Sequence, residues 1–163
     1  MRTGLPPVVD DGTRVLVLGS MPGELSLRRQ QYYAHPRNVF WRIMSELVGF
    51  DACDYDLRLA AMRAAGIGLW DVLRACDRAG SLDAAIVEDS MEANDFDVLF
   101  AQCPSIARVY FNGGKAEQVF RRIVLPGLGV PVECRRLPST SPTNARYTFE
   151  GKLQAWRAVI EVG

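Results

Sequence analysis

Two stretches of the chain concentrate residue types that could do chemistry on a ligand. The first, GSMPGELSLRRQQYYAHPRNVFW, runs from Gly19 to Trp41 and holds the only histidine of the chain, four aromatic side chains and two glycines. The second, LPSTSPTNARY at residues 137–147, combines small hydroxyl side chains with two prolines. Aromatic rings can stack on a planar ligand, and small side chains allow close approach to a sugar–phosphate backbone. Both stretches are therefore candidate binding loops.

The first stretch opens with a glycine-rich turn, GSMPG, at residues 19–23. Backbone N–H groups of such a turn, here around Ser20, can surround an anion or a polarised oxygen, because glycine lets the backbone come close to a ligand. The turn contains neither the GK[ST] of a Walker motif nor the GxGxxG of a dinucleotide site. A tight strand-to-helix turn without a ligand is the alternative interpretation of these residues.

The segment YYAHPRN at residues 32–38 offers three further candidates, each with a structural alternative. Tyr33 can stack on a nucleobase, or it can pack the loop with its hydroxyl hydrogen-bonded. His35 can exchange a proton near neutral pH, although a histidine before proline is also typical of a loop anchor. Asn38 can hold a water or a base edge with its amide, or it can simply cap the following helix.

Basic residues in the two stretches predict a local cationic surface on a neutral protein. The formal net charge is zero, and seventeen of the nineteen basic residues are arginine. A zero net charge excludes a protein that coats nucleic acid by bulk charge, but it leaves room for a basic rim on a cleft. The arginines that would form this rim are Arg28, Arg29, Arg37 and Arg146.

Length and composition place limits on the class of protein. A chain of 163 residues suits one domain, residues 1–163, with residues 1–13 as a surface-laid N-terminal lead-in. No apolar run is long enough to span a bilayer and no secretory signal is visible, so we expect a cytoplasmic monomer. The cysteines are widely spaced and form no CxxC pair; they are Cys53, Cys76, Cys103 and Cys134. This spacing argues against disulfides and, with a single histidine, against a structural zinc site or an iron–sulfur cluster, and we expect neither a metal nor a cofactor.

The elements that must position these loops follow from the hydrophobic pattern. Short apolar runs predict strands at 14–20, 67–73, 106–113 and 130–137, and helical spacing predicts helices at 38–50, 55–66, 94–104, 114–125 and 148–162. Asn94 and Thr148 are the expected caps of two of these helices. The alternation predicts an α/β fold, a doubly wound, mostly parallel sheet in three α/β/α layers. Ligands bind beyond the carboxyl ends of such strands, so the two loops should converge on one cleft.

The motifs VLGSMPGELSL, YYAHPRNVFW and LPSTSPTN, in that order, resemble the uracil-DNA glycosylase superfamily. The resemblance is strongest to its hypoxanthine-DNA (deoxyinosine) glycosylase branch, and next to the mismatch-specific uracil/thymine glycosylases. It extends from about Arg14 to Glu161, and the middle motif is the most specific of the three. It implies a doubly wound α/β fold and removal of a damaged base from double-stranded DNA by cleavage of its N-glycosidic bond.

The resemblance also assigns roles to residues. Gly19, Met21, Pro22 and Gly23 would surround the flipped base together with His35, and Tyr33 would stack on it. The loop from Pro138 to Asn144 would press into the minor groove. The DNA-binding residues expected on this basis are Arg37, Pro138, Ser139, Thr140, Ser141, Pro142, Asn144 and Arg146.

One residue departs from the pattern of the mismatch-specific relatives, which carry a catalytic asparagine at the position of Met21. A methionine cannot polarise water, so the resemblance to the hypoxanthine branch assigns the catalytic amide to Asn38. The backbone N–H at Ser20 would stabilise the departing base. Neither loop contains a lysine, which argues against a Schiff base and strand cleavage.

The sequence therefore predicts a metal-free, monofunctional DNA glycosylase that removes deaminated bases. Hypoxanthine is the first expected substrate, and uracil or thymine opposite guanine is the second. Two alternatives remain: a catalytically inactive DNA-binding module, for which Met21 is the argument, and a small nucleotide- or nucleoside-binding protein that uses the same cleft.

Overall fold

A parallel sheet of four strands forms the centre of the computed structural model, which describes residues 1–51 and 54–161. The strands are β2 (Val15–Gly19), β3 (Ile67–Asp71), β6 (Arg108–Asn112) and β7 (Glu133–Leu137). Their order across the sheet is β3-β2-β6-β7, with Gly19 opposite Asp71 and Leu18 opposite Phe111. The next strand of this sheet along the chain, β3, lies on one side of β2, and β6 lies on the other, so the strand order changes direction at β2, the place where α/β sheets form a ligand crevice.

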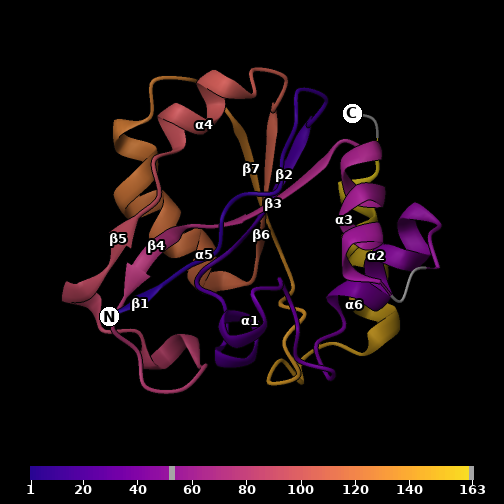
Figure 1. Ribbon diagram of the computed structural model, residues 1–163, viewed down its shortest axis with the longest axis horizontal. Helices are drawn as coiled ribbons and strands as arrows, with labels where there is room; N and C mark the ends of the chain where they lie inside the picture. The colour runs from indigo at the N-terminus through magenta and orange to yellow at the C-terminus, as the bar shows by residue number, and fades with distance from the viewer. Residues whose placement is uncertain (52–53, 162–163) are drawn as a thin grey trace.

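Helices cover both faces of the sheet, as the alternation of strands and helices predicts. Figure 1 shows α2 (Phe40–Val48), α3 (Tyr55–Ala64) and α6 (Phe149–Trp156) on one side, and α4 (Phe96–Gln102) and α5 (Gly114–Val119) on the other. Because successive side chains of a strand point to opposite faces, β2 contributes to two separate cores.

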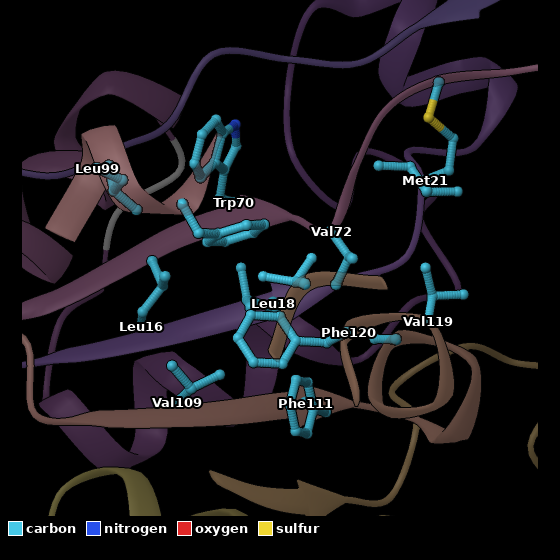
Figure 2. Close-up of a cluster of buried hydrophobic side chains, with 14 of the residues drawn as sticks. Leu16, Leu18, Met21, Trp70, Val72, Leu99, Val109, Phe111, Val119 and Phe120 are labelled. Carbon is cyan, nitrogen blue, oxygen red and sulfur yellow. The ribbon is translucent and has the colours of Figure 1, made fainter. Parts of the chain in front are cut away.

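The two cores divide the residues of β2 between them. Val15 and Val17 pack with the helices α2, α3 and α6, whereas Leu16 and Leu18 pack with α4 and α5. Figure 2 shows the second of these clusters, in which Phe120 lies near Leu18. The apolar run of β2 is continuous because both of its faces are buried.

Of the two helix caps predicted from the sequence, the cap of α6 is confirmed and the cap of α4 is wrong. The Thr148 hydroxyl accepts a hydrogen bond from the Gly151 N–H at 3.1 Å, which confirms Thr148 as the cap of α6. The cap of α4 is Asp95, whose carboxylate accepts from the Val98 N–H, so the prediction of Asn94 was wrong by one residue. The side chain of Asn94 instead donates to the Asp71 carbonyl, which ties the start of α4 to the end of β3.

The N-terminal lead-in is built into the fold, which corrects the prediction of a surface-laid segment. Strand β1 (Arg2–Thr3) pairs antiparallel with β4 (Leu73–Cys76), and β5 (Glu92–Ala93) completes a second, small sheet. Leu5 and Val8 are buried, and the Trp70 indole donates to the Leu5 carbonyl at 3.2 Å. This sheet was not predicted, because its pairing is non-local and its strands are very short.

A segment between β4 and β5, residues 77–90, is here called the strap. It contains two short 3-10 helices, Asp83–Ala85 and Glu88–Ser90, and it approaches the carboxyl end of β2. Helix α1 (Glu24–Arg29) follows β2 directly and lies at the same end of the molecule (Figure 1). A π-helix (Phe120–Val124) and a 3-10 turn (Leu125–Gly127) extend α5, and a 3-10 turn (Arg157–Val159) extends α6.

The three cysteines in the described part of the chain are free thiols. Cys76 and Cys103 are buried and Cys134 is half-buried, whereas Cys53 lies outside the described residues, as does the end of the predicted final helix at Val162. None of the helices within 1–51 and 54–161 is long and apolar enough to cross a membrane.

Candidate active site at the carboxyl edge of the sheet

A cavity of about 510 Å³ opens where the central strands end. Each of the four strands contributes a residue at or just beyond its carboxyl end: Gly19 from β2, Asp71 from β3, Asn112 from β6 and Ser139 after β7. The two candidate loops both line this one cavity, as the switch-point rule leads one to expect. The strap adds Ser81 to Ala84 to the wall.

Most of the residues singled out in the sequence line this cavity. They are Gly19, Ser20, Met21, Pro22, Gly23, Tyr33, His35, Arg37, Asn38, Ser139, Thr140, Ser141 and Pro142. Three are not among its lining residues: Pro138 accepts a hydrogen bond from the Trp156 indole, Asn144 donates to the Ser139 carbonyl, and Arg146 is exposed. Asp71, Asn112 and the strap residues line it without having been predicted.

The two adjacent tyrosines have different environments. Tyr32 is buried, and its hydroxyl donates to the Pro6 carbonyl at 2.7 Å, so it belongs to the core. Tyr33 stacks on Phe40, with 4.0 Å between the ring centroids and 25° between the planes. Its backbone has a φ of +53°, a left-handed conformation that is uncommon outside glycine. Phe40 therefore fixes one face of the Tyr33 ring at the wall of the cavity.

The Tyr33 hydroxyl has no hydrogen-bond partner among the described residues, although it is buried. Burial raises the pKa of this phenol well above its usual value, the nearby Asp71 carboxylate raises it further, and the Asn112 side chain opposes the shift. The hydroxyl therefore stays protonated and remains a donor. A buried donor without a partner costs free energy unless a ligand or water pairs with it.

Asn38 lies two residues before the start of α2 and lines the cavity. Its side-chain oxygen accepts from the Phe40 N–H at 2.9 Å, and its backbone N–H donates to the His35 carbonyl at 3.0 Å. The N-cap of α2 is Val39, so the alternative of Asn38 as the cap was wrong by one residue, although the Asn38 side chain still pairs with the first N–H of the helix. This pairing leaves the second lone pair of the amide oxygen and the amide NH₂ for a ligand.

His35 is exposed, and its Nδ1 accepts from the Arg37 N–H at 3.2 Å. This bond makes His35 an anchor of its own loop. Val39, four residues further along, donates its N–H to the Thr140 carbonyl at 3.2 Å and so joins the two candidate loops directly.

The loop after β7 is held from beneath by buried polar groups. Asn112 and Thr140 exchange two hydrogen bonds of 2.9 Å each, between the Asn112 amide and the Thr140 backbone N–H and hydroxyl. The buried Lys152 of α6 donates to the Ser141 carbonyl at 3.3 Å. A loop with so many fixed contacts presents a preformed surface to a ligand.

Asp71 is the functional candidate that sequence reasoning missed. It is 4% exposed, and its Oδ2 has no hydrogen-bond partner among the described residues. Burial raises the pKa of this carboxyl to about 7; the Asp83 carboxylate raises it too, while the Arg78 guanidinium opposes the shift. An aspartate that ends an otherwise apolar buried strand was the available signal. Such a group, beside a cavity, is poised to meet a ligand.

Met21 turns its side chain into the core that Figure 2 shows and is 6% exposed. The Ser20 hydroxyl donates to Asp83 of the strap. In this turn it is therefore the backbone, more than the side chains, that is presented to the cavity.

A second cavity of about 430 Å³ adjoins the first and shares Tyr33, His35 and Asn38 with it. Three arginines line it, Arg29, Arg42 and Arg58, together with Trp41 and Tyr55. Arg42 also lies over the Phe149 ring at 3.6 Å. In the part of the chain that the structure describes, no group of three or more histidine, cysteine or acidic side chains could hold a metal ion.

The profile of the uracil DNA glycosylase superfamily matches residues 6–160, which is nearly the whole chain and includes every wall of the cavity. The chain belongs to the uracil DNA glycosylase superfamily. Within this superfamily it is 38% identical to the hypoxanthine DNA glycosylase of Methanosarcina barkeri over 157 residues, 95% of each chain. It is also 38% identical to the hypoxanthine DNA glycosylase of Methanosarcina acetivorans over 162 residues, 98% of each chain.

A solved structure supports the superfamily fold. The solution NMR structure of a Methanosarcina acetivorans protein, provisionally described as a uracil DNA glycosylase, superimposes with a TM-score of 0.79 and 36% sequence identity. The superposition covers 97% of this chain and 95% of that one. The predicted family and the predicted α/β/α fold are confirmed.

Proposed function

We propose that this member of the superfamily is a monofunctional DNA glycosylase that removes hypoxanthine from double-stranded DNA, with uracil or thymine opposite guanine as second substrates. Two relatives that match it over nearly their full lengths are named hypoxanthine DNA glycosylases. The observation that carries the proposal is the single cavity in which Tyr33, Asn38, Asp71 and the Gly19–Gly23 turn meet.

The cavity suits a base that has left the duplex. A volume of about 510 Å³ lies within the range of small-molecule sites, and the opening is bordered by the loop expected to touch DNA. An enzyme that acts on a base must flip it out of the stack, and stacking inside the pocket offsets part of that cost. The Tyr33 ring, fixed from behind by Phe40, is a rigid platform for this stacking.

Asp71 supplies an acceptor that distinguishes a deaminated base from its parent. Deamination of adenine converts ring N1 from an acceptor to an N–H donor, and deamination of cytosine does the same at N3. In its ionised form, Asp71 can accept from this new N–H at the unpaired Oδ2, whereas adenine would set a lone pair against the carboxylate. A site built around such a hydrogen bond rejects the analogue that lacks the donor.

The reaction needs little acid–base chemistry from the protein. The C1′–N bond breaks and its electron pair leaves with the base, water forms the new C1′–O bond, and the proton that water loses balances the one that the base gains. The Gly19–Gly23 turn would stabilise the base anion through backbone N–H groups. Asn38 would hold the attacking water through its amide, because a cationic sugar requires a positioned water more than a strong base.

A single-turnover excision assay tests the proposal. Duplexes carry hypoxanthine, uracil, thymine, xanthine or undamaged adenine opposite each normal base, and the abasic product is revealed by alkali. We expect hypoxanthine to be released fastest, adenine not at all, and no strand cleavage before alkali. Duplex binding without release of any base would identify an inactive DNA-binding module. Affinity for free nucleosides without duplex affinity would identify a nucleotide-binding protein.

A further inference from the structure

A buried arginine of the strap lies behind the Gly19–Gly23 turn. Arg78 is 5% exposed, and its guanidinium donates to the carbonyls of Met21 at 3.4 Å, Pro22 at 2.5 Å and Gly80 at 2.8 Å. No carboxylate of the described residues lies within ion-pair distance of it. Burying a cation whose only partners are carbonyls costs folding free energy, so packing alone does not account for Arg78 at this position.

The remaining carbonyls of the turn are held on the protein side as well. The Gly19 carbonyl accepts from the Val72 N–H at 2.8 Å, and the Ser20 carbonyl accepts from the Leu73 N–H at 3.1 Å. Four successive carbonyls, from Gly19 to Pro22, are thus engaged by the β3–β4 backbone and by Arg78.

The fixed carbonyls determine where the N–H groups of the turn point. All described peptide bonds are trans, so each N–H points away from the carbonyl of the same peptide unit. The N–H groups of Ser20, Met21 and Gly23 consequently point away from the strap and β3. Within residues 1–51 and 54–161, the hydrogen bonds leave these three N–H groups without a protein acceptor, and all three residues line the cavity.

The strap holds this arrangement at two more points. The Ser81 hydroxyl accepts from the Glu24 N–H at 2.9 Å, and Asp83 accepts from the Ser20 hydroxyl. Arg78 is the only cation among these contacts, and among the described residues it alone donates to the carbonyls of Met21 and Pro22.

We propose that Arg78 is a positioning residue for base release: it holds the carbonyls of Met21 and Pro22 so that the N–H groups of the turn face the departing base. Its charge polarises those two peptide units and adds positive potential where the base becomes an anion. This inference rests on the proposed glycosylase function. A preorganised group of this kind favours the transition state because nothing must reorient when charge develops.

The test compares two leaving bases of the same shape. In 8-azahypoxanthine a ring nitrogen replaces C8–H, which makes the departing anion more stable than that of hypoxanthine. If Arg78 serves the anion, Arg78→Met should slow single-turnover release of hypoxanthine at least tenfold and release of 8-azahypoxanthine by less than threefold. Arg78→Lys keeps the charge and should retain the wild-type ratio between the two bases.

The matched control is Arg74→Met on β4, because Arg74 is exposed and pairs only with Glu92 among the described residues. It should change neither rate. Equal losses on both bases for Arg78→Met, or no loss, would overturn the inference and leave the glycosylase function intact. If Arg78→Met does not fold by circular dichroism, Arg78→Lys and Arg78→Gln are compared instead, with the selective loss expected for glutamine alone. No base release by the wild type would overturn the proposed function, and the inference with it.

Discussion

The carboxylate of Asp71 lies directly against the bare Cα of Gly19, on the neighbouring strand of the sheet. A Cβ built on Gly19 would collide with Asp71 Oδ1 and would lie 3.4 Å from the Tyr33 hydroxyl. The backbone of Gly19 does not have a positive φ, so the glycine is required by this close approach and by no conformational need. The first glycine of the GSMPG turn therefore makes room for Asp71.

Gly19→Ala should displace the Asp71 carboxylate and lower hypoxanthine excision at least tenfold. Overpacking of this kind costs about 1–3 kcal/mol of unfolding free energy. Single-turnover excision and chemical denaturation measure the two effects. Gly127→Ala is the control, because a Cβ there meets no atom within 4 Å. Normal excision by Gly19→Ala would show that the contact with Asp71 has no part in the reaction.

Asp71 should make the protein less stable as the pH rises from about 4 to 7. The pKa of this carboxyl is about 7 in the folded protein, above its ordinary value of 3.8, so in this window the folded protein keeps a proton that the unfolded chain has lost. The effect can reach about 1.4 kcal/mol per pH unit. Asp71→Asn should remove it, so the difference in unfolding free energy between variant and wild type should grow with pH. Parallel stability curves between pH 4 and 8 would contradict this prediction.

Tyr33 should act through its ring and not through its hydroxyl. Tyr33→Phe keeps the stack on Phe40 and removes a buried donor that has no partner in the described structure, so unfolding free energy should be unchanged or slightly higher. Its excision rate should stay within threefold of the wild type. Tyr33→Ala should lose the stacking energy of about 1–3 kcal/mol in kcat/KM. A loss for Tyr33→Phe as large as that for Tyr33→Ala would assign the role to the hydroxyl.

Asn38→Ala should lower single-turnover excision about a hundredfold, the scale of one preorganised polar group. It should also cost about 1 kcal/mol of stability, because the Phe40 N–H loses its acceptor. Asn38→Asp separates the two effects, since a carboxylate keeps an acceptor for the Phe40 N–H and for water but has no NH₂ donor. Activity of Asn38→Asp close to wild type would indicate water positioning, and full excision by Asn38→Ala would refute a catalytic amide.

Arg37 lines the cavity and is exposed, so it should contact a phosphate of bound DNA. Arg37→Ala should weaken binding to all duplex sequences alike and reduce the slope of log K against log salt by about 1. Fluorescence anisotropy at several salt concentrations measures this slope. Arg157→Ala, on the exposed surface after α6, is the matched control and should leave the slope unchanged.

The sequence determined the sheet, the main helices and both loops of the site. The apolar run of β2 and the spacing of apolar residues in α2 are local signals. They predict a strand and a helix correctly because the apolar side chains of both elements are buried, as the pattern requires. Tyr33 and Asn38 could also be found, because they occur within one short motif whose residue types are unusual together. The cap of α4 was misplaced by one residue, since Asn94 and Asp95 are equally good caps by composition.

Only the tertiary structure decided the roles of Asp71 and Arg78. Asp71 has its raised pKa chiefly because the fold buries its carboxyl, and further because the strap brings Asp83 near it, and neither effect can be read from the residues next to it in the sequence. Arg78 is one of seventeen arginines, and nothing local marks it as the one that is buried behind the turn. The lead-in is misread for the same reason: its burial depends on pairing with β4, far along the chain. Local pattern fixes which element forms, whereas desolvation and charge depend on which distant residues surround a side chain.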